Sequence, residues 1–317
     1  MHGYGGPTKP QQPPLLLLLG ELSGETKHAF ADLTNNACSG INFPELESQS
    51  ECLSSRFGWL LILSRQTSSL FFFNPITHNR INLPYLKHNI LIATFSAPPT
   101  SPNCTVFTIK MPFDNSTSLR IDTLTLGHKH SAWIPQINHS KGLRYLVDGI
   151  LVNGLLYCVD LKGSVGIFDL KQGSWKVFSC KGSNQRVRFS YLVEFSGEVY
   201  AVRNKSFRRS GVVVDKRVLI QRLKIDDGHG FAVWEDGKFL GGVSVYVGPY
   251  GSCVIPVHDE GLKEEKRKFV VANHGPESKC VVYDVEDDDH GCVYHKRTTY
   301  GGKYFGWCYA PVWIERD

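Results

Sequence analysis

The sequence lacks the patterns that most enzyme classes require. None of its nine cysteines forms a C-x-x-C pair, so zinc and thioredoxin-like sites have no support. No G-x-S-x-G, G-x-x-x-x-G-K-[ST] or G-x-G-x-x-G motif occurs, so the common hydrolase elbow is missing and phosphate-binding loops are unsupported. No long apolar stretch repeats with helical periodicity, which argues against a helical fold.

The net charge is also small. The formal net charge is +5 over 317 residues, too small to predict a nucleic-acid partner by itself. Hydrophobic residues make up 42% and charged residues 21%, as in globular proteins. The odd number of cysteines, spread evenly and often within apolar runs, favours reduced core cysteines. We therefore expect a cytoplasmic or nuclear protein.

The N-terminal region offers one candidate targeting segment, the leucine run at residues 15–19. The run is too short for a signal-peptide core and far too short to span a bilayer. We interpret it as a buried strand and expect no membrane partner. Residues 1–14 are rich in Gly, Pro and Gln, and their composition predicts disorder.

Internal repeats are the strongest feature present. An I-N-[FL]-P-x-L sequence begins at Ile41 and again at Ile81, an offset of 40 residues. Residues 152–159 match residues 195–202 at an offset of 43. In this pair Asn-Gly and Ser-Gly turns lead into strands that end in Tyr-x-Val, so Gly154 and Gly197 should occupy equivalent hairpin turns.

Each matched unit continues with a further strand and then a tryptophan. The continuing strands are expected at residues 165–170 and 218–226, and weaker units at residues 105–126 and 269–286. Repeats of this size predict an all-β propeller of four-stranded blades over residues 15–317. Six blades are counted, and a seventh could lie within residues 239–257. Long loops are expected at residues 96–103, 204–215 and 258–268.

Ring closure and tryptophan packing follow from the same repeats. The β-forming C-terminal segment, residues 304–314, should enter the sheet formed near residues 15–33. Pro311 should then lie at a sheet edge or strand end, because it has no N–H to donate. The tryptophans that recur about once per blade should pack between blades instead of forming a ligand cage; these are Trp59, Trp133, Trp175 and Trp234.

Several segments together resemble a known family. They are Ser55-x-x-Gly58-Trp59-Leu60-Leu61, residues 73–77, Ile81-x-Leu83-Pro84, Asp148-Gly149 with Asn153-Gly154-x-x-Tyr157, residues 283–287, and the segment from Trp307 to Trp313. As a set they resemble plant F-box/kelch-repeat-type proteins with a KIB-type β-propeller. The resemblance implies a protein-interaction propeller that selects substrates for a ubiquitin ligase. Family members commonly carry an N-terminal F-box that binds a Skp-type adaptor. Nothing like an F-box precedes residue 15 here, so we expect no adaptor binding by this chain as written.

Three segments invite a chemical role. His128 and His130 could ligate a metal, but no third ligand is visible nearby. The acidic residues 284–290 lack the glycine and glutamate of an EF-hand loop, so a solvated hairpin turn is the better interpretation. Residues 203–224 could contact nucleic acid, although only Phe207 is available for stacking. The basic side chains of this stretch are Arg203, Lys205, Arg208, Arg209, Lys216, Arg217, Arg222 and Lys224.

The leading hypothesis is a non-enzymatic protein-interaction module. No catalytic, cofactor-binding or metal-binding residue is assigned, no cofactor is expected, and the partner-binding residues are unknown. Two alternatives stay open. One is a propeller enzyme acting on a small molecule or sugar, and the other is a nucleic-acid binder that uses residues 203–224.

Overall fold

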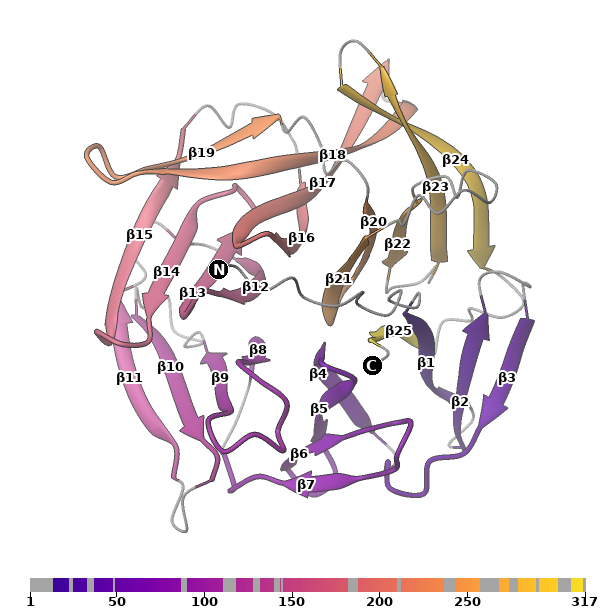
Figure 1. The fold of residues 1–317 in the computed structure, drawn as a ribbon, viewed down its shortest axis with the longest axis vertical. Helices are drawn as coiled ribbons and strands as arrows, with labels where there is room; N and C mark the ends of the chain where they lie inside the picture. Colours follow the sequence, from indigo (N-terminus) through magenta and orange to yellow (C-terminus); the bar gives the residue numbers. More distant parts are fainter. Residues whose placement is uncertain are drawn as a thin grey trace, which may run out of the picture.

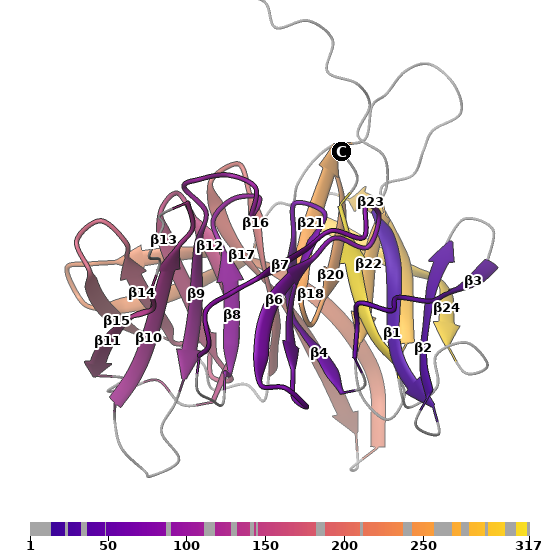
Figure 2. The same ribbon diagram turned by 90° about the horizontal axis from the view of Figure 1, so that it is seen from below.

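The computed structural model places β-strands in a ring (Figure 1). It describes residues 14–22, 25–32, 37–47, 49–86, 90–110, 118–127, 132–139, 143, 145–181, 188–209, 212–236, 243–256, 268–273, 279–288, 291–301 and 309–315. No helix occurs among these residues. The inner strands cross the thickness of the ring, as the side view shows (Figure 2). The predicted all-β propeller is confirmed, while the segment predicted to be disordered, 1–14, lies almost wholly outside the described residues.

The first three sets of strands are four-stranded and antiparallel. The first runs, from the centre outward, β25 (Tyr309–Ile314), β1 (Leu15–Leu22), β2 (Glu25–Asp32) and β3 (Ala37–Ile41). The second is β4 (Ser50–Arg56), β5 (Trp59–Ser64), β6 (Ser69–Phe73) and β7 (Arg80–Asn82). The third is β8 (Ile92–Phe95), β9 (Thr105–Lys110), β10 (Ser118–Thr125) and β11 (Ile134–His139).

The remaining strands form three further sets. The fourth is β12 (Leu146–Val152), β13 (Leu155–Asp160), β14 (Val165–Asp169) and β15 (Ser174–Cys180). The fifth is β16 (Arg188–Phe195), β17 (Glu198–Arg209), β18 (Val212–Asp226) and β19 (Phe231–Asp236). The sixth has the order β21 (Gly251–Pro256), β20 (Val243–Gly248), β22 (Lys268–Asn273), β23 (Lys279–Asp288) and β24 (Gly291–Gly301). This grouping of the described strands is compatible with the predicted six or seven blades.

The hairpin turns after the inner strands repeat from set to set. Asn153 and Gly154 have φ of 51° and 80°, and Ser196 and Gly197 have φ of 52° and 78°. Two successive positive values define the type I′ turn that suits the twist of a hairpin. The predicted equivalence of Gly154 and Gly197 is confirmed, and the turn before β5, at Gly58, repeats the same conformation.

The ring is closed by the C-terminal strand. β25 pairs antiparallel with β1 from Leu15 opposite Ile314 to Gly20 opposite Tyr309. Val312 and Ile314 pack toward the second set, while Trp313 packs toward the sixth set. Because successive side chains of a strand point to opposite faces, β25 is buried on both sides. The predicted closure is confirmed, and Pro311 lies in a strand that is paired on one side only.

The tryptophans do pack between sets, as predicted. Trp234 on β19 donates its indole N–H to the Gly163 carbonyl of the fourth set at 2.8 Å. Trp133 donates in the same way to the Pro84 carbonyl of the second set at 2.9 Å. Trp59 and Trp175 contribute to the apolar clusters between the second and third and between the third and fourth sets.

Two features of the sheets differ from the sequence-based expectation. The loop predicted at residues 204–215 is instead the outer part of the β17–β18 hairpin, which pairs from Tyr200 opposite Arg222 to Arg209 opposite Val212. The valines near its turn favour strand over loop in spite of the many basic residues. In addition, β15 and β19 pair in parallel through Ser179 and Cys180, which joins the fourth and fifth sets into one eight-stranded sheet.

Candidate binding site in the central channel

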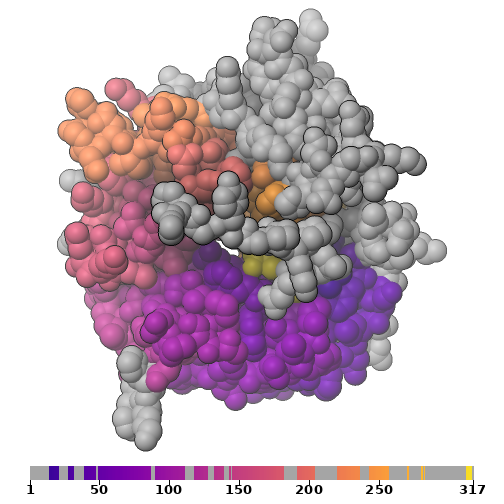
Figure 3. All heavy atoms as spheres, in the orientation of Figure 1, coloured from indigo at the N-terminus to yellow at the C-terminus, as the bar shows by residue number. Residues whose placement is uncertain are grey.

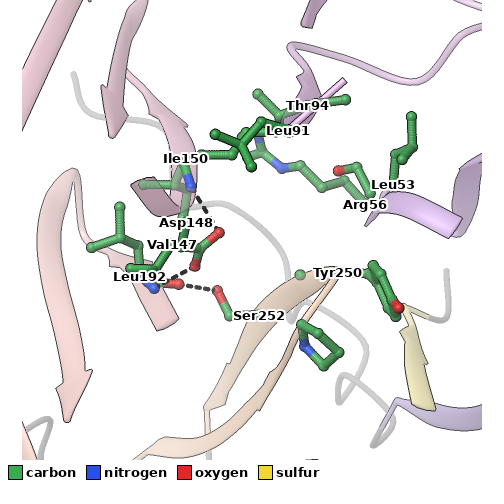
Figure 4. Close-up of a pocket in the computed structure, with 16 residues that line it drawn as sticks. Leu53, Arg56, Leu91, Thr94, Val147, Asp148, Ile150, Leu192, Tyr250 and Ser252 are labelled. Atoms are coloured by element: carbon green, nitrogen blue, oxygen red, sulfur yellow. Dashed lines mark hydrogen bonds between the residues drawn. The ribbon is translucent and has the colours of Figure 1, made fainter. Parts of the chain in front are cut away.

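The inner strands converge on a cavity at the centre of the ring. Its volume is about 70 Å³, and residues of β4, β8, β12, β16 and β21 line it (Figure 4). The space-filling view shows the surface hollowed near the centre of the ring, beside atoms of the C-terminal strand (Figure 3). Polar atoms contribute more of the wall than apolar ones, and its aliphatic side chains include Leu53, Leu91, Ile92, Val147 and Ile150.

Asp148 supplies the only carboxyl group among the described residues that line this cavity. Its Oδ1 accepts the Gly149 N–H at 2.7 Å, and its Oδ2 accepts the Leu192 N–H of β16 at 2.6 Å. The side chain is half-buried and faces the cavity inside the ring. Desolvation therefore raises the pKa of Asp148 to about 7, and the two N–H donors only partly oppose this rise.

A β-bulge brings Asp148 to this position. The β12–β13 register shifts between Leu146 and Asp148, so that Val147 has no opposite partner. The β16–β17 register shifts in the same way between Phe189 and Tyr191. Asp148 and Tyr191 each lie four residues before the last residue of their inner strand, so they are equivalent in the repeat. Bulges re-aim side chains in this manner, often beside functional sites.

Hydrogen bonds from side chains join the inner strands around the channel. Ser252 on β21 donates to the Leu192 carbonyl at 2.8 Å, so Leu192 is held from both neighbouring sets. Ser55 on β4 donates its hydroxyl to the Trp313 carbonyl and its N–H to the Tyr250 carbonyl. A Cβ on the adjacent Gly251 would overlap the Ser55 carbonyl oxygen. The backbone therefore approaches too closely at this point for any other residue.

Arg56 is the cation of the channel. Its Nη1 donates to the Phe95 carbonyl of β8 at 3.1 Å. Burial lowers the pKa of the guanidinium, while the carboxylates of Glu315 and Glu194 act in the opposite direction. The charge of Arg56 is thus compensated by groups other than Asp148.

The candidates singled out in the sequence lie elsewhere. His128 and His130 fall outside the described residues. Most of the acidic segment, predicted to be a hairpin turn, is instead paired strand: residues 284–288 belong to β23 and pair with β24 from Asp284 opposite His295 to Asp288 opposite Gly291. Residues 289 and 290 lie outside the described residues. Among the described residues, no group of three or more His, Cys, Asp or Glu side chains is placed to hold a metal ion.

The described members of the basic stretch are engaged within their sheet. Arg203 is buried and donates to Gln221. Arg222 forms an ion pair with Glu198, and Lys224 lies 2.8 Å from a carboxylate oxygen of Glu235. Side chains between residues 204 and 219 lie outside the description, so the nucleic-acid hypothesis is not tested by them.

Asp148 was not recognised from the sequence as a site residue. It entered only as part of a family-like Asp-Gly segment. The available signal was a single acidic residue within the otherwise apolar run at residues 146–152, since buried carboxylates are rare without a specific role.

No helix among the described residues has the length and apolar character needed to cross a membrane.

The closed ring and the channel at its centre define a β-propeller. The chain belongs to the KIB1-4 beta-propeller family, whose model matches residues 30–295. The resemblance to plant F-box/kelch-repeat-type proteins with a KIB-type propeller is thereby confirmed.

Two relatives of the chain are F-box proteins of Arabidopsis thaliana. The chain is 27% identical over 243 residues to "F-box/kelch-repeat protein At3g18720", covering 74% of this chain and 60% of that protein. It is 24% identical over 291 residues to "F-box protein At3g56470", covering 86% of this chain and 69% of that protein. Among solved structures, TolB from Acinetobacter baumannii aligns with a TM-score of 0.51 at 14% identity, over 96% of this chain and 67% of that one, a likeness of fold alone.

Proposed function

We propose that this chain is a non-enzymatic protein-interaction module, the substrate-recognition propeller of an F-box-type ubiquitin-ligase subunit. The observation that carries the proposal is membership of the KIB1-4 beta-propeller family over residues 30–295. The names of the relatives support it, because both proteins compared above are F-box proteins. The chain spans about 60% of the length of the first of them, so the ligase role of a whole protein is part of the proposal.

The chemistry of the channel supports binding over catalysis. Both oxygens of Asp148 accept backbone N–H groups, and one of these bonds crosses to the neighbouring set. Such a carboxyl orders the inner strands. Glycoside hydrolysis, in contrast, uses two carboxyl groups that flank the scissile bond. We therefore rank a sugar-processing propeller below the interaction module.

Three further elements belong to the proposal. Residues 15–317 form one propeller domain, the protein works in the cytoplasm or nucleus, and the partner is a protein destined for ubiquitination. The chain as written does not bind a Skp-type adaptor on its own. Size-exclusion chromatography of the purified chain mixed with such an adaptor tests the last point, and stoichiometric co-elution would overturn it.

The main experiment uses the full chain expressed with an affinity tag in plant cells. After chemical crosslinking and nuclease treatment, quantitative mass spectrometry should find a protein partner in near-stoichiometric amount. The lifetime of that partner should lengthen when the chain is depleted. A chain that purifies alone, or a partner whose turnover does not change, would contradict the proposed function. Recovery that depends on nucleic acid would favour the basic stretch instead.

A further inference from the structure

The channel cavity places one carboxyl group beside aliphatic side chains. A single carboxyl group, Asp148, faces a space whose lining is more polar than apolar but includes several aliphatic side chains. Leu53, Leu91 and Val147 surround the same space, as the close-up shows (Figure 4). An aliphatic chain could pack against these three side chains while its end reached the carboxyl group, and a charge interaction in a partly desolvated place is stronger than in water.

The carboxyl group retains capacity for further donors. An ionised carboxylate offers about four lone-pair positions, and each oxygen of Asp148 accepts one backbone N–H. The hydroxyl proton of Ser252 is committed to the Leu192 carbonyl. The hydroxyl oxygen of Ser252 is therefore available as an acceptor, and Ser252 lines the same cavity.

The other titratable groups around Asp148 do not supply a permanent counter-ion. Burial raises the pKa values of Cys158 on β13 and Tyr191 on β16, and the Asp148 charge raises them further. Burial also raises the pKa of Tyr250, at the β20–β21 turn. These three groups are therefore neutral near pH 7. Arg56 on β4 is directed to the Phe95 carbonyl and lies in the field of two other carboxylates.

We propose that this cavity binds a primary ammonium group on an aliphatic stem, the chemistry of a lysine side chain, with the Asp148 carboxylate as its counter-ion. The assignment of that lysine to a protein partner rests on the proposed function. An ammonium group brings three donors in a compact volume, which suits a cavity of about 70 Å³. Arg56 also lines the cavity but is directed to the Phe95 carbonyl. An anion would face the Asp148 carboxylate at close range, so we expect the site to favour a cation.

The test compares four probes of similar stem length with the full chain in an amine-free buffer. The probes are n-butylammonium, Nα-acetyl-lysine methylamide, n-butanol and butyrate. The backbone amide signals of Leu192 and Gly149 report binding by nuclear magnetic resonance, because both amides donate to Asp148. Both ammonium probes should shift these signals, whereas butanol and butyrate should bind at least tenfold more weakly.

The pH dependence gives a second readout. Only the ionised carboxyl binds the cation, and the pKa of free Asp148 is about 7. The apparent dissociation constant for n-butylammonium should therefore fall about tenfold between pH 6 and pH 8, with release of a proton on binding. Affinity that does not change with pH, or butyrate binding more tightly than n-butylammonium, would overturn the proposal.

Two variants separate the site from the fold. Asp148→Asn keeps the side-chain size but removes the charge, and it should weaken n-butylammonium binding at least tenfold at pH 8. Asp169→Asn is the matched control, because Asp169 caps the β14–β15 turn through the Lys171 and Gln172 N–H groups, away from the cavity. Unchanged binding by Asp148→Asn refutes the proposal. If this variant does not fold, the comparison of probes with the unmodified chain still decides.

The outcomes also distinguish this inference from the proposed function. Binding of n-butylammonium without binding of the lysine derivative would refute a partner's lysine as the occupant. A protein partner captured in plant cells, with no ammonium binding in the cavity, would refute the cavity site alone. Ammonium binding without any protein partner would refute the interaction function alone.

Discussion

Replacing Trp313 by alanine tests how much of the stability depends on ring closure. Trp313 is 3% exposed, and its ring lies edge-on to Tyr246 of the sixth set with centroids 5.3 Å apart. Truncating a buried tryptophan costs about 3–5 kcal/mol, from lost transfer free energy and the cavity left behind. We expect a loss of about 4 kcal/mol in the free energy of unfolding.

The expected change in melting temperature follows from the chain length. An unfolding entropy of about 2.1 cal/mol/K per residue gives about 0.67 kcal/mol/K for this chain of 317 residues. A loss of about 4 kcal/mol then lowers Tm by about 6 °C. Urea unfolding followed by tryptophan fluorescence and circular dichroism measures the free energy independently.

Two variants control for the loss of an aromatic side chain. Tyr85 is 66% exposed, so Tyr85→Ala should change the free energy by less than about 0.5 kcal/mol. Trp313→Phe keeps a ring between the sets and should cost less than half as much as Trp313→Ala. If Trp313→Ala melts within about 1 °C of the unmodified chain, β25 does not hold the ring closed and the reasoning fails.

Three further predictions concern other buried positions. Burial lowers the pKa of His28 below its ordinary value of 6.5. The contribution of His28 to the free energy of unfolding is therefore full above pH 6.5 and is lost as pH falls through the folded-state pKa. Urea unfolding from about pH 8 to 5 should show this decline, and His28→Phe should flatten it. In thermal unfolding, Gly251→Ala should lower the free energy of unfolding by more than about 2 kcal/mol, because the added Cβ would meet the backbone of β4. Gly40→Ala is the control and should leave the stability unchanged, because a Cβ there meets no atom within 4 Å. Asp122 is fully buried and its carboxylate lies 3.0 Å from the ammonium group of the mostly buried Lys110, so Asp122→Ala should lower the free energy of unfolding by about 3–5 kcal/mol. The control Glu235→Ala breaks an exposed pair and should cost at most about 1 kcal/mol. Equal losses for these two variants would contradict the argument.

Much of the propeller could be predicted from local sequence. The turns at Asn153-Gly154 and Ser196-Gly197 depend on residues that tolerate positive φ, a preference that acts within a few positions of the chain. The strands between them alternate or are wholly apolar, so their burial is written in the order of residue types. Closure by β25 followed from the same kind of information. A β-rich segment at one end of the chain and the leucine run at the other each needed a partner strand.

The binding site could not be predicted in this way. Asp148 reaches the channel because Val147 is left out of the β12–β13 register, and such a bulge depends on which hydrogen bonds the neighbouring strand completes. Its carboxyl group is held by the Leu192 N–H, 44 residues further along the chain. Neither contact has a local signature.

The sequence by itself therefore determined the repeating unit, its hairpin turns and the pairing of the two ends of the chain, because these depend on short-range preferences and on burial of apolar runs. Only the tertiary structure decided which side chains face the channel and that β15 and β19 join two sets in parallel. These features depend on how whole sheets are placed around the ring. The desolvation that raises the pKa of Asp148 has the same origin, since the ring, and not the strand that carries the residue, partly shields that carboxyl group from water.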